Sequence, residues 1–92
     1  MTKPQHEIEE IFKGCISTLR VLKYFMLCNE PVSKYTIQKD MMISVSDSLL
    51  ERLCRQGVLI KYSYGVTKYK MNRNNKLVIL MEEFFKKIGY IS

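Results

Sequence analysis

The stretch Val58–Asn72 (VLIKYSYGVTKYKMN) constrains the fold more than any other part of the chain. It is typical of two short strands joined by a tight turn at Tyr64-Gly65-Val66-Thr67, which predicts a β-hairpin. Residues 58–76 carry five of the 15 lysines and arginines of the chain and no acidic residue. A cationic hairpin with interleaved tyrosines indicates a surface for a polyanion. Lysines also protect an exposed strand edge from aggregation, so the hairpin alone leaves both interpretations open.

Length and composition indicate one small globular domain. A chain of 92 residues buries only a modest core, and dimerisation would supplement its stability. The formal net charge of +6 favours an anionic partner, with nucleic acid ahead of a membrane surface. No apolar run approaches the length of a membrane span, and the N-terminus is polar and acidic. We therefore expect a cytoplasmic protein with no membrane partner, associated with the nucleoid when it is bound to DNA.

Apolar spacing predicts one long helix at the start of the chain, over residues 5–28. Its apolar residues recur at intervals of four and three, which is the stripe of an amphipathic helix. Gly14 interrupts this stripe and marks a kink or a break into two helices. The helix ends before Pro31, because a residue that precedes proline avoids the helical region.

Two shorter helices are predicted before the hairpin, over residues 33–41 and 46–57. Ser33 and Ser46 are the predicted N-caps of the two helices. Gly57 ends the second helix in a left-handed conformation, directly before the first strand.

A last helix is predicted over residues 73–90, with Asn72 as its N-cap. It is apolar on well over half of its circumference, and a terminal helix cannot bury so much surface against a small domain. We expect it to pack, with part of the first helix, against a second copy of the chain. The predicted dimerisation residues are Ile8, Phe12, Cys15, Leu77, Leu80, Met81, Phe84, Phe85 and Ile88.

The sequence argues against a metal site and against an enzyme. Cys15, Cys28 and Cys54 have no CxxC spacing and only one histidine as a further ligand, so no metal is predicted. Three cysteines fit reduced, partly buried thiols, with an intersubunit disulfide as the alternative. There is no paired-carboxylate motif, no glycine-rich phosphate loop and no nucleophile with a recognisable base, and no cofactor is predicted.

The order of elements resembles a winged helix-turn-helix domain. Ser33 to Met41 is similar to the first helix of the pair, and Leu50-x-x-Leu53-x-x-x-Gly57-Val58-Leu59 is similar to the end of a recognition helix that runs into a strand. Tyr69-x-Met71-Asn72 is similar to the strand exit of that family, with asparagine in place of the usual threonine. The resemblance covers residues 15–76, and it is closest to small dimeric archaeal, archaeal-viral and bacterial regulators of the PadR, MarR and ArsR type.

This resemblance implies a mainly α fold with a small β-hairpin (α+β), as a single domain over residues 1–92. The 46–57 helix would enter the major groove, and the hairpin would be a wing along the backbone or in the minor groove. The DNA-binding residues that it implies are Lys34, Tyr35, Lys39, Ser44, Ser46, Ser48, Arg52, Arg55, Lys61, Tyr64, Lys68, Lys70 and Arg73.

Within this set, the wing residues Lys68 and Lys70 are the strongest phosphate partners, with Lys61 and Tyr64 beside them. Arg52 and Arg55 fit DNA contacts and surface ion pairs equally well.

Two acidic residues complicate the recognition helix. Asp47 and Glu51 would repel phosphate, so we expect them as caps or ion-pair partners, Glu51 with Arg55 four residues on.

The predicted function is a sequence-specific double-stranded DNA-binding regulator of transcription that acts as a homodimer. Its half-sites would be one helical turn apart, roughly 34 Å. One alternative is a non-specific architectural, chromatin-like DNA binder. The other is a protein-interaction winged helix with the apolar last helix as its binding surface. No small-molecule ligand is predicted.

Overall fold

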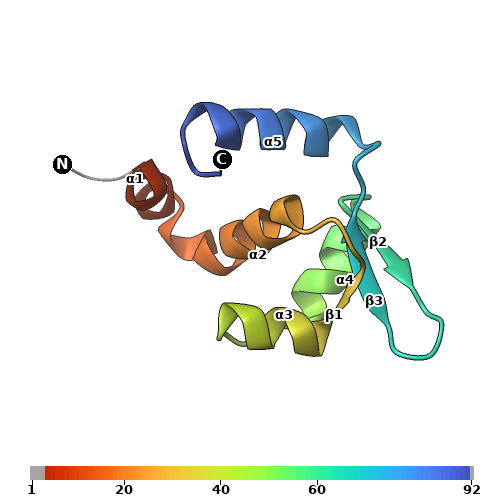
Figure 1. Ribbon diagram of the computed structural model, residues 1–92. Coiled ribbons are helices and arrows are strands. Elements are labelled where there is room, and N and C mark those ends of the chain that lie inside the picture. Colours follow the sequence, from red (N-terminus) through yellow and green to blue (C-terminus); the bar gives the residue numbers. More distant parts are fainter. Residues whose placement is uncertain (1–3, 92) are drawn as a thin grey trace.

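The computed structural model describes residues 4–91, so residues 1–3 and 92 of the predicted domain lie outside the described residues (Figure 1). In chain order, the elements are α1 (Pro4–Ile11), the 3₁₀ turn η1 (Lys13–Cys15), α2 (Ile16–Leu27), β1 (Val32–Ser33), α3 (Lys34–Met41), α4 (Asp47–Arg55), β2 (Leu59–Tyr62), β3 (Lys68–Met71) and α5 (Lys76–Lys87). The fold is mainly helical with one small antiparallel sheet, which confirms the predicted α+β class.

The first predicted helix is broken, as the position of Gly14 indicated. Helix α1 ends at Ile11, and the chain passes through η1 before α2 begins at Ile16. The amide of Cys15 donates to the carbonyl oxygen of Phe12 at 2.7 Å, which closes the tight turn. The break lets α1 lie beside the C-terminal end of α5 instead of continuing the axis of α2 (Figure 1).

Both predicted serine caps are present at the short helices. The hydroxyl oxygen of Ser33 accepts from the amide of Thr36 at 3.2 Å, and that of Ser46 accepts from the amide of Leu49 at 3.1 Å. These bonds satisfy amides that the first turn of a helix leaves without a partner. Gly57 follows α4 with a φ of 76°, in the left-handed conformation predicted for it.

The sheet has the strand order β1-β3-β2, and all neighbours are antiparallel. The predicted hairpin forms β2 and β3, with Leu59 opposite Met71 and Tyr62 opposite Lys68. Strand β1 was not predicted: it lies outside the hairpin, where Val32 pairs with Tyr69 of β3. A strand of two residues has no periodicity, so only its tertiary partner makes it recognisable.

The predicted N-cap of the last helix is wrong. Asn75 caps α5, because its side-chain oxygen accepts from the amide of Leu77 at 2.8 Å. Asn72 instead donates from Nδ2 to the carbonyl oxygen of Gly57 at 3.0 Å, and Asn75 donates to the same oxygen at 2.9 Å. Two side-chain amides thus tie the exit of the hairpin to the end of α4, and α5 starts three residues later than predicted.

The last helix also ends earlier than predicted, at Lys87. Gly89 has a φ of 78°, which turns the chain back, and the amide of Tyr90 donates to the carbonyl oxygen of Phe85 at 2.8 Å. The ring of Tyr90 is buried and packs edge-on against Phe85.

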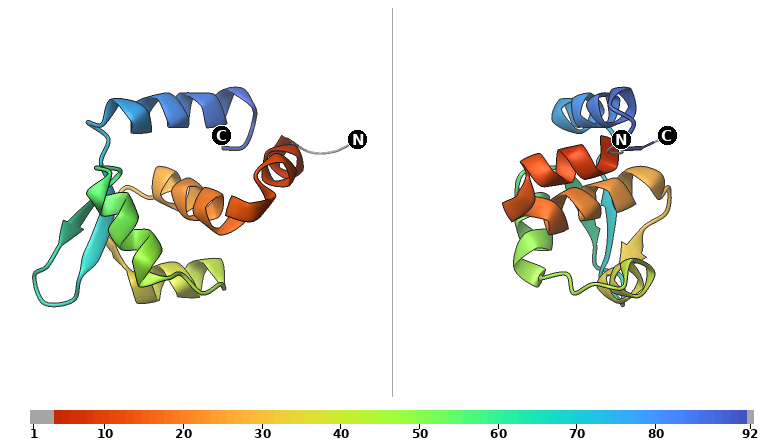
Figure 2. Two further views of the ribbon diagram at one scale, coloured as in Figure 1. Left: turned by 180° about the vertical axis from the view of Figure 1, so that it is seen from behind. Right: turned by 90° about the vertical axis from the view of Figure 1, so that its left-hand side faces the viewer.

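The core lies on both sides of α2. Helix α5 covers one side, and α3 and α4 lie on the other (Figures 1 and 2). The most deeply buried side chains come from all of these elements and from the sheet: Val21, Phe25, Ile37, Leu50, Met71, Val78 and Tyr90. Removing each large apolar side chain from water contributes about 1.5–3 kcal/mol.

Candidate nucleic-acid interface

The hairpin has two faces with different chemistry. Because side chains alternate along a strand, Tyr69 and Met71 point into the core while Lys68 and Lys70 lie on the outer face. Lys61 pairs with Tyr69 across the hairpin, so it lies on the inner face. The expectation that Lys61 stands beside Lys68 and Lys70 is therefore wrong. The neighbours of the two lysines on the outer face are Ile60 and Tyr62, which were not predicted as part of the site.

Lys61 reaches helix α4 rather than the outer face. Its Nζ lies 2.9 Å from Oε1 of Glu51, and this contact raises the pKa of Lys61. The predicted Glu51–Arg55 pair is not formed, because the tertiary approach of β2 gives Glu51 a lysine that its own helix does not supply.

The starts of α3 and α4 meet at a second ion pair. Nζ of Lys34, at the first position of α3, lies 3.0 Å from Oδ1 of Asp47, at the first position of α4. Tyr35 and Lys39, two of the predicted DNA-binding residues, are exposed on α3. The ring of Tyr35 is 72% exposed.

Helix α4 keeps a polar outer face. Its apolar side chains Leu49, Leu50 and Leu53 are buried, while Arg52 and Arg55 are exposed and make no ion pair with any residue of the described part of the chain.

Three serines lie at or near the start of this helix. Ser44, Ser46 and Ser48 are all exposed. The hydroxyl of Ser46 accepts a capping bond with its oxygen, which leaves its proton for another acceptor.

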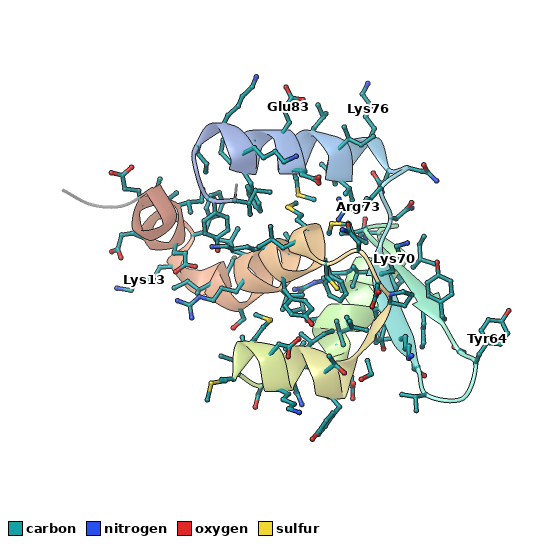
Figure 3. All side chains as sticks on the ribbon, viewed as in Figure 1. Lys13, Tyr64, Lys70, Arg73, Lys76 and Glu83 are labelled. Carbon is teal, nitrogen blue, oxygen red and sulfur yellow. The ribbon has the colours of Figure 1, made fainter. Side chains whose placement is uncertain are left out.

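The tip of the hairpin projects into solvent. Figure 3 shows Tyr64 at the far end of the loop between β2 and β3, well away from the helices. Its side chain is 91% exposed, and Gly65 beside it has a φ of 73°, the conformation that lets the loop turn tightly. The exposed Tyr64 could thus touch a partner, whereas the side chain of Tyr69 is buried in the core.

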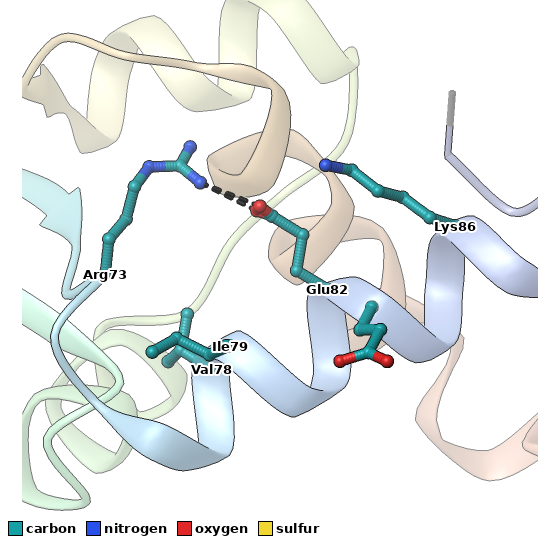
Figure 4. Close-up of a pocket in the computed structure, with 6 residues that line it drawn as sticks. Arg73, Val78, Ile79, Glu82 and Lys86 are labelled. Atoms are coloured by element: carbon teal, nitrogen blue, oxygen red, sulfur yellow. Dashed lines mark hydrogen bonds and ion pairs between the residues drawn. The ribbon is translucent and has the colours of Figure 1, made fainter.

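Arg73, predicted as a DNA contact, makes its contacts among the described residues with α2 and α5 and not with the hairpin. Its Nη1 lies 2.8 Å from Oε2 of Glu82 on α5, and its Nη2 donates to the carbonyl oxygen of Met26 at 2.9 Å (Figure 4). Longer bonds, each of 3.4 Å, reach the carbonyl oxygens of Phe25 and Cys28. The guanidinium therefore satisfies carbonyls at the C-terminal end of α2 and lines a pocket of about 300 Å³ against α5.

Helix α5 presents an apolar stripe to solvent. Leu77, Leu80 and Phe84 are each about half exposed. Ile79 is also half exposed but lies on the other flank of α5, where it lines the pocket of Arg73. Helix α5 lies across α2 from α3, on the side of the molecule opposite the start of the helix pair (Figure 1).

The predicted dimerisation residues divide into three groups. Ile8 and Phe85 are buried within the chain, so they stabilise the fold instead of facing a second copy. Met81 and Ile88 pack partly against the core. The side chains that remain exposed are Phe12, Cys15, Leu77, Leu80 and Phe84.

An apolar groove continues this stripe between α1 and α5. It has a volume of about 370 Å³, and its lining residues are Glu7, Ile8, Ile11, Phe84 and Ile88.

A polar cluster beside the groove was not predicted. Both Nε and Nη2 of Arg20 donate to the carboxylate of Glu9, at 3.1 and 3.0 Å, and the hydroxyl of Tyr90 donates to Oε2 at 2.9 Å. Arg20 holds the pKa of Glu9 below its usual value, although burial opposes this shift. No spacing in the sequence relates Glu9 to Tyr90, which is 81 residues away.

Candidate metal sites, disulfides and membrane-spanning helices are absent from the described residues. Residues 4–91 contain no group of three histidine, cysteine or acidic side chains that could hold a metal ion. Cys15 is exposed, Cys28 and Cys54 are half-buried, and all three are free thiols. No helix in the described range has the length and apolarity needed to cross a membrane.

In comparisons with protein-family models, with curated proteins and with solved structures, the chain has no match.

Proposed function

We propose that this protein is a sequence-specific double-stranded DNA-binding regulator of transcription, with a winged helix-turn-helix fold, that acts as a homodimer. The observation that carries the proposal is the outer face of the hairpin. Lys68 and Lys70 lie there two residues apart on β3, with no ion pair to any described residue. The other face of the hairpin packs on α4, and the exposed face of α4 carries Arg52 and Arg55.

Ion pairs connect the three elements that would contact DNA. Lys34–Asp47 joins the starts of α3 and α4, and Lys61–Glu51 joins α4 to β2. In the proposed complex, α4 enters the major groove, where Arg52 and Arg55 reach phosphates or guanine edges. The hairpin follows the backbone through Lys68 and Lys70, with Tyr64 at its tip.

The apolar stripe of α5 supports the homodimer. Leu77, Leu80 and Phe84 form a contiguous surface at helical spacing, and exposed patches of this kind mark protein interfaces. A two-fold dimer through this stripe would leave both helix pairs free, because they lie on the other side of α2.

Duplex binding as a function of salt tests the proposal. We expect a steep fall in affinity as the salt concentration rises, because each phosphate contact releases counterions and adds about 0.9 to the slope of log K against log [salt]. Lys68→Glu combined with Lys70→Glu should abolish most of this binding. The matched control is Lys76→Glu with Lys86→Glu, which changes the charge equally on α5, where Lys76 points away from the hairpin (Figure 3). Flat salt dependence, or equal losses in both double variants, would contradict the proposal.

Selection of bound duplexes from a random pool separates sequence-specific from architectural binding. An enriched motif with two half-sites about one helical turn apart supports the regulator. Binding without enrichment would instead support the non-specific architectural alternative.

The exposed stripe of α5 also favours a protein-interaction module as the second candidate. Sizing of the purified protein discriminates the two, because a stable homodimer covers the stripe. A monomer that binds no duplex at low salt would favour the interaction module.

A further inference from the structure

Two of the predicted DNA-binding lysines form ion pairs with acidic residues of α4. Nζ of Lys34 lies 3.0 Å from Oδ1 of Asp47, and Nζ of Lys61 lies 2.9 Å from Oε1 of Glu51. Lys68 and Lys70, by contrast, have no such partner among the described residues. The surface therefore contains both paired and unpaired lysines, and the paired ones are those within reach of Asp47 and Glu51 on α4.

The two carboxylates form a short acidic strip. Asp47 and Glu51 are four residues apart, so they lie one turn apart on the same side of α4. Their lysines come from the elements on either side, Lys34 from α3 and Lys61 from β2. The Asp47 side chain is 79% exposed and that of Glu51 is 52% exposed, so both pairs lie in solvent.

Stability does not account for these pairs. An exposed lysine–carboxylate pair contributes about 0–1 kcal/mol, because both groups are well solvated when apart. Asp47 is favourable at the start of α4, but like charges one turn apart on a helix repel each other by a similar amount, so Glu51 adds no net stability through α4 itself.

We propose that Glu51 and Asp47 act as intramolecular counter-ions, which keep Lys61 and Lys34 from DNA phosphates and thereby limit the sequence-independent affinity of this surface. This inference rests on the proposed function. To contact a phosphate, each lysine must leave its carboxylate, and the carboxylate is then left unpaired beside the DNA backbone. Replacing a carboxylate partner by a phosphate therefore adds little binding free energy. Most of the electrostatic attraction to DNA then comes from Lys68, Lys70 and the arginines of α4. A lower affinity for random DNA raises the share of binding that base contacts decide.

Salt titration of a fluorescent random-sequence duplex with the full chain tests this inference. Glu51→Gln and Asp47→Asn should each raise the affinity about fivefold to tenfold at moderate salt and steepen the slope of log K against log [salt] by about 0.9. The control is Glu83→Gln, which removes the same charge from an exposed carboxylate 3.2 Å from Lys87 on α5. Figure 3 shows Glu83 on the outer side of α5, so the slope should not change in this control.

A second variant distinguishes two effects of removing the Glu51 charge: release of Lys61 from its ion pair, and loss of the repulsion between Glu51 and DNA phosphates. In a Glu51→Gln background, Lys61→Met should return the slope to that of the original protein, because the released cation is gone. A slope that stays steep in the double variant would overturn the inference, as would equal effects of Glu51→Gln and Glu83→Gln.

Failure of the inference is distinguishable from failure of the proposed function. If the original protein binds duplex with steep salt dependence but the slope is the same in Glu51→Gln, only the counter-ion role is wrong. If neither protein binds duplex at low salt, the DNA-binding function fails, and the counter-ion role fails with it.

Discussion

The guanidinium of Arg73 is paired with the carboxylate of Glu82, with 2.8 Å between Nη1 and Oε2. The same group donates to the carbonyl oxygen of Met26 at 2.9 Å, at the C-terminal end of α2. A cation is favourable there, because the last carbonyls of a helix have no intrahelical partner and carry partial negative charge. One side chain thus joins the exit of the hairpin to α2 and α5.

Arg73→Ala should destabilise the protein by about 1–3 kcal/mol, because the carbonyls of α2 lose their donor and Glu82 loses its partner. Urea denaturation measures this change in the free energy of unfolding. Lys70→Ala is the control: it removes a cation of the outer face and should change stability by less than about 0.5 kcal/mol. If Arg73→Ala kept full stability and lost duplex binding, the residue would belong to the DNA surface after all.

Gly57→Ala should destabilise the protein by about 1–2 kcal/mol. Gly57 has a φ of 76°, and an added Cβ would lie 3.2 Å from Nδ2 of Asn75, the amide that holds the Gly57 carbonyl. The control is Gly14→Ala, where no atom lies within 4 Å of the added Cβ and the backbone is not left-handed. We expect that control to leave the melting temperature unchanged or raise it. Equal losses at both positions would show that the left-handed cap is not what Gly57 supplies.

The Glu9–Arg20 pair should make stability depend on acid pH. Arg20 lowers the pKa of Glu9 in the folded chain from the ordinary value of 4.5. A carboxylate with a lowered folded pKa stabilises the fold fully above its unfolded pKa and loses that contribution as the pH falls through the folded one. Glu9→Gln should therefore cost about 1 kcal/mol at neutral pH and progressively less below about pH 4.5.

Urea unfolding at several pH values measures the difference between Glu9→Gln and the original protein. Glu10→Gln removes the same charge from an exposed neighbour that has no ion pair within the described residues, and it serves as the control. A difference for Glu9→Gln that stayed constant down to about pH 3 would mean that the carboxylate charge is not what Arg20 and Tyr90 recognise.

Leu80→Glu should weaken the proposed homodimer at least about tenfold, since it puts a charge at the centre of the α5 stripe. Sedimentation at a series of concentrations gives the dissociation constant. Leu27→Glu is the control, because Leu27 is 58% exposed on α2 and Leu80 is 52% exposed. Should both variants dimerise as the original protein does, the interface lies elsewhere.

Local signals in the sequence predicted most of the elements. The break near Gly14, the serine caps at Ser33 and Ser46, and the left-handed Gly57 each depend on residues within one or two turns of the chain. The structure confirms all of them. Asn72 and Asn75 are both good caps by composition, and a local pattern cannot choose between them. The choice is made by the carbonyl of Gly57, which binds both side-chain amides and sets where α5 begins.

The candidate site was predictable in composition but not in arrangement. Lys61, Lys68 and Lys70 form one basic cluster in sequence, yet the register of the hairpin puts Lys61 on the opposite face, against Glu51. Arg73 has the same charge and a similar place in the sequence, yet it lies at the end of α2.

The sequence by itself determined most of the elements, the serine caps and the concentration of positive charge in residues 58–76. Only the tertiary structure decided which of these cations face solvent and which have a carboxylate or a helix end as partner. The physical reason is range: caps and turns are satisfied by neighbours along the chain, whereas an ion pair forms with whichever opposite charge the packing of distant elements brings within about 4 Å.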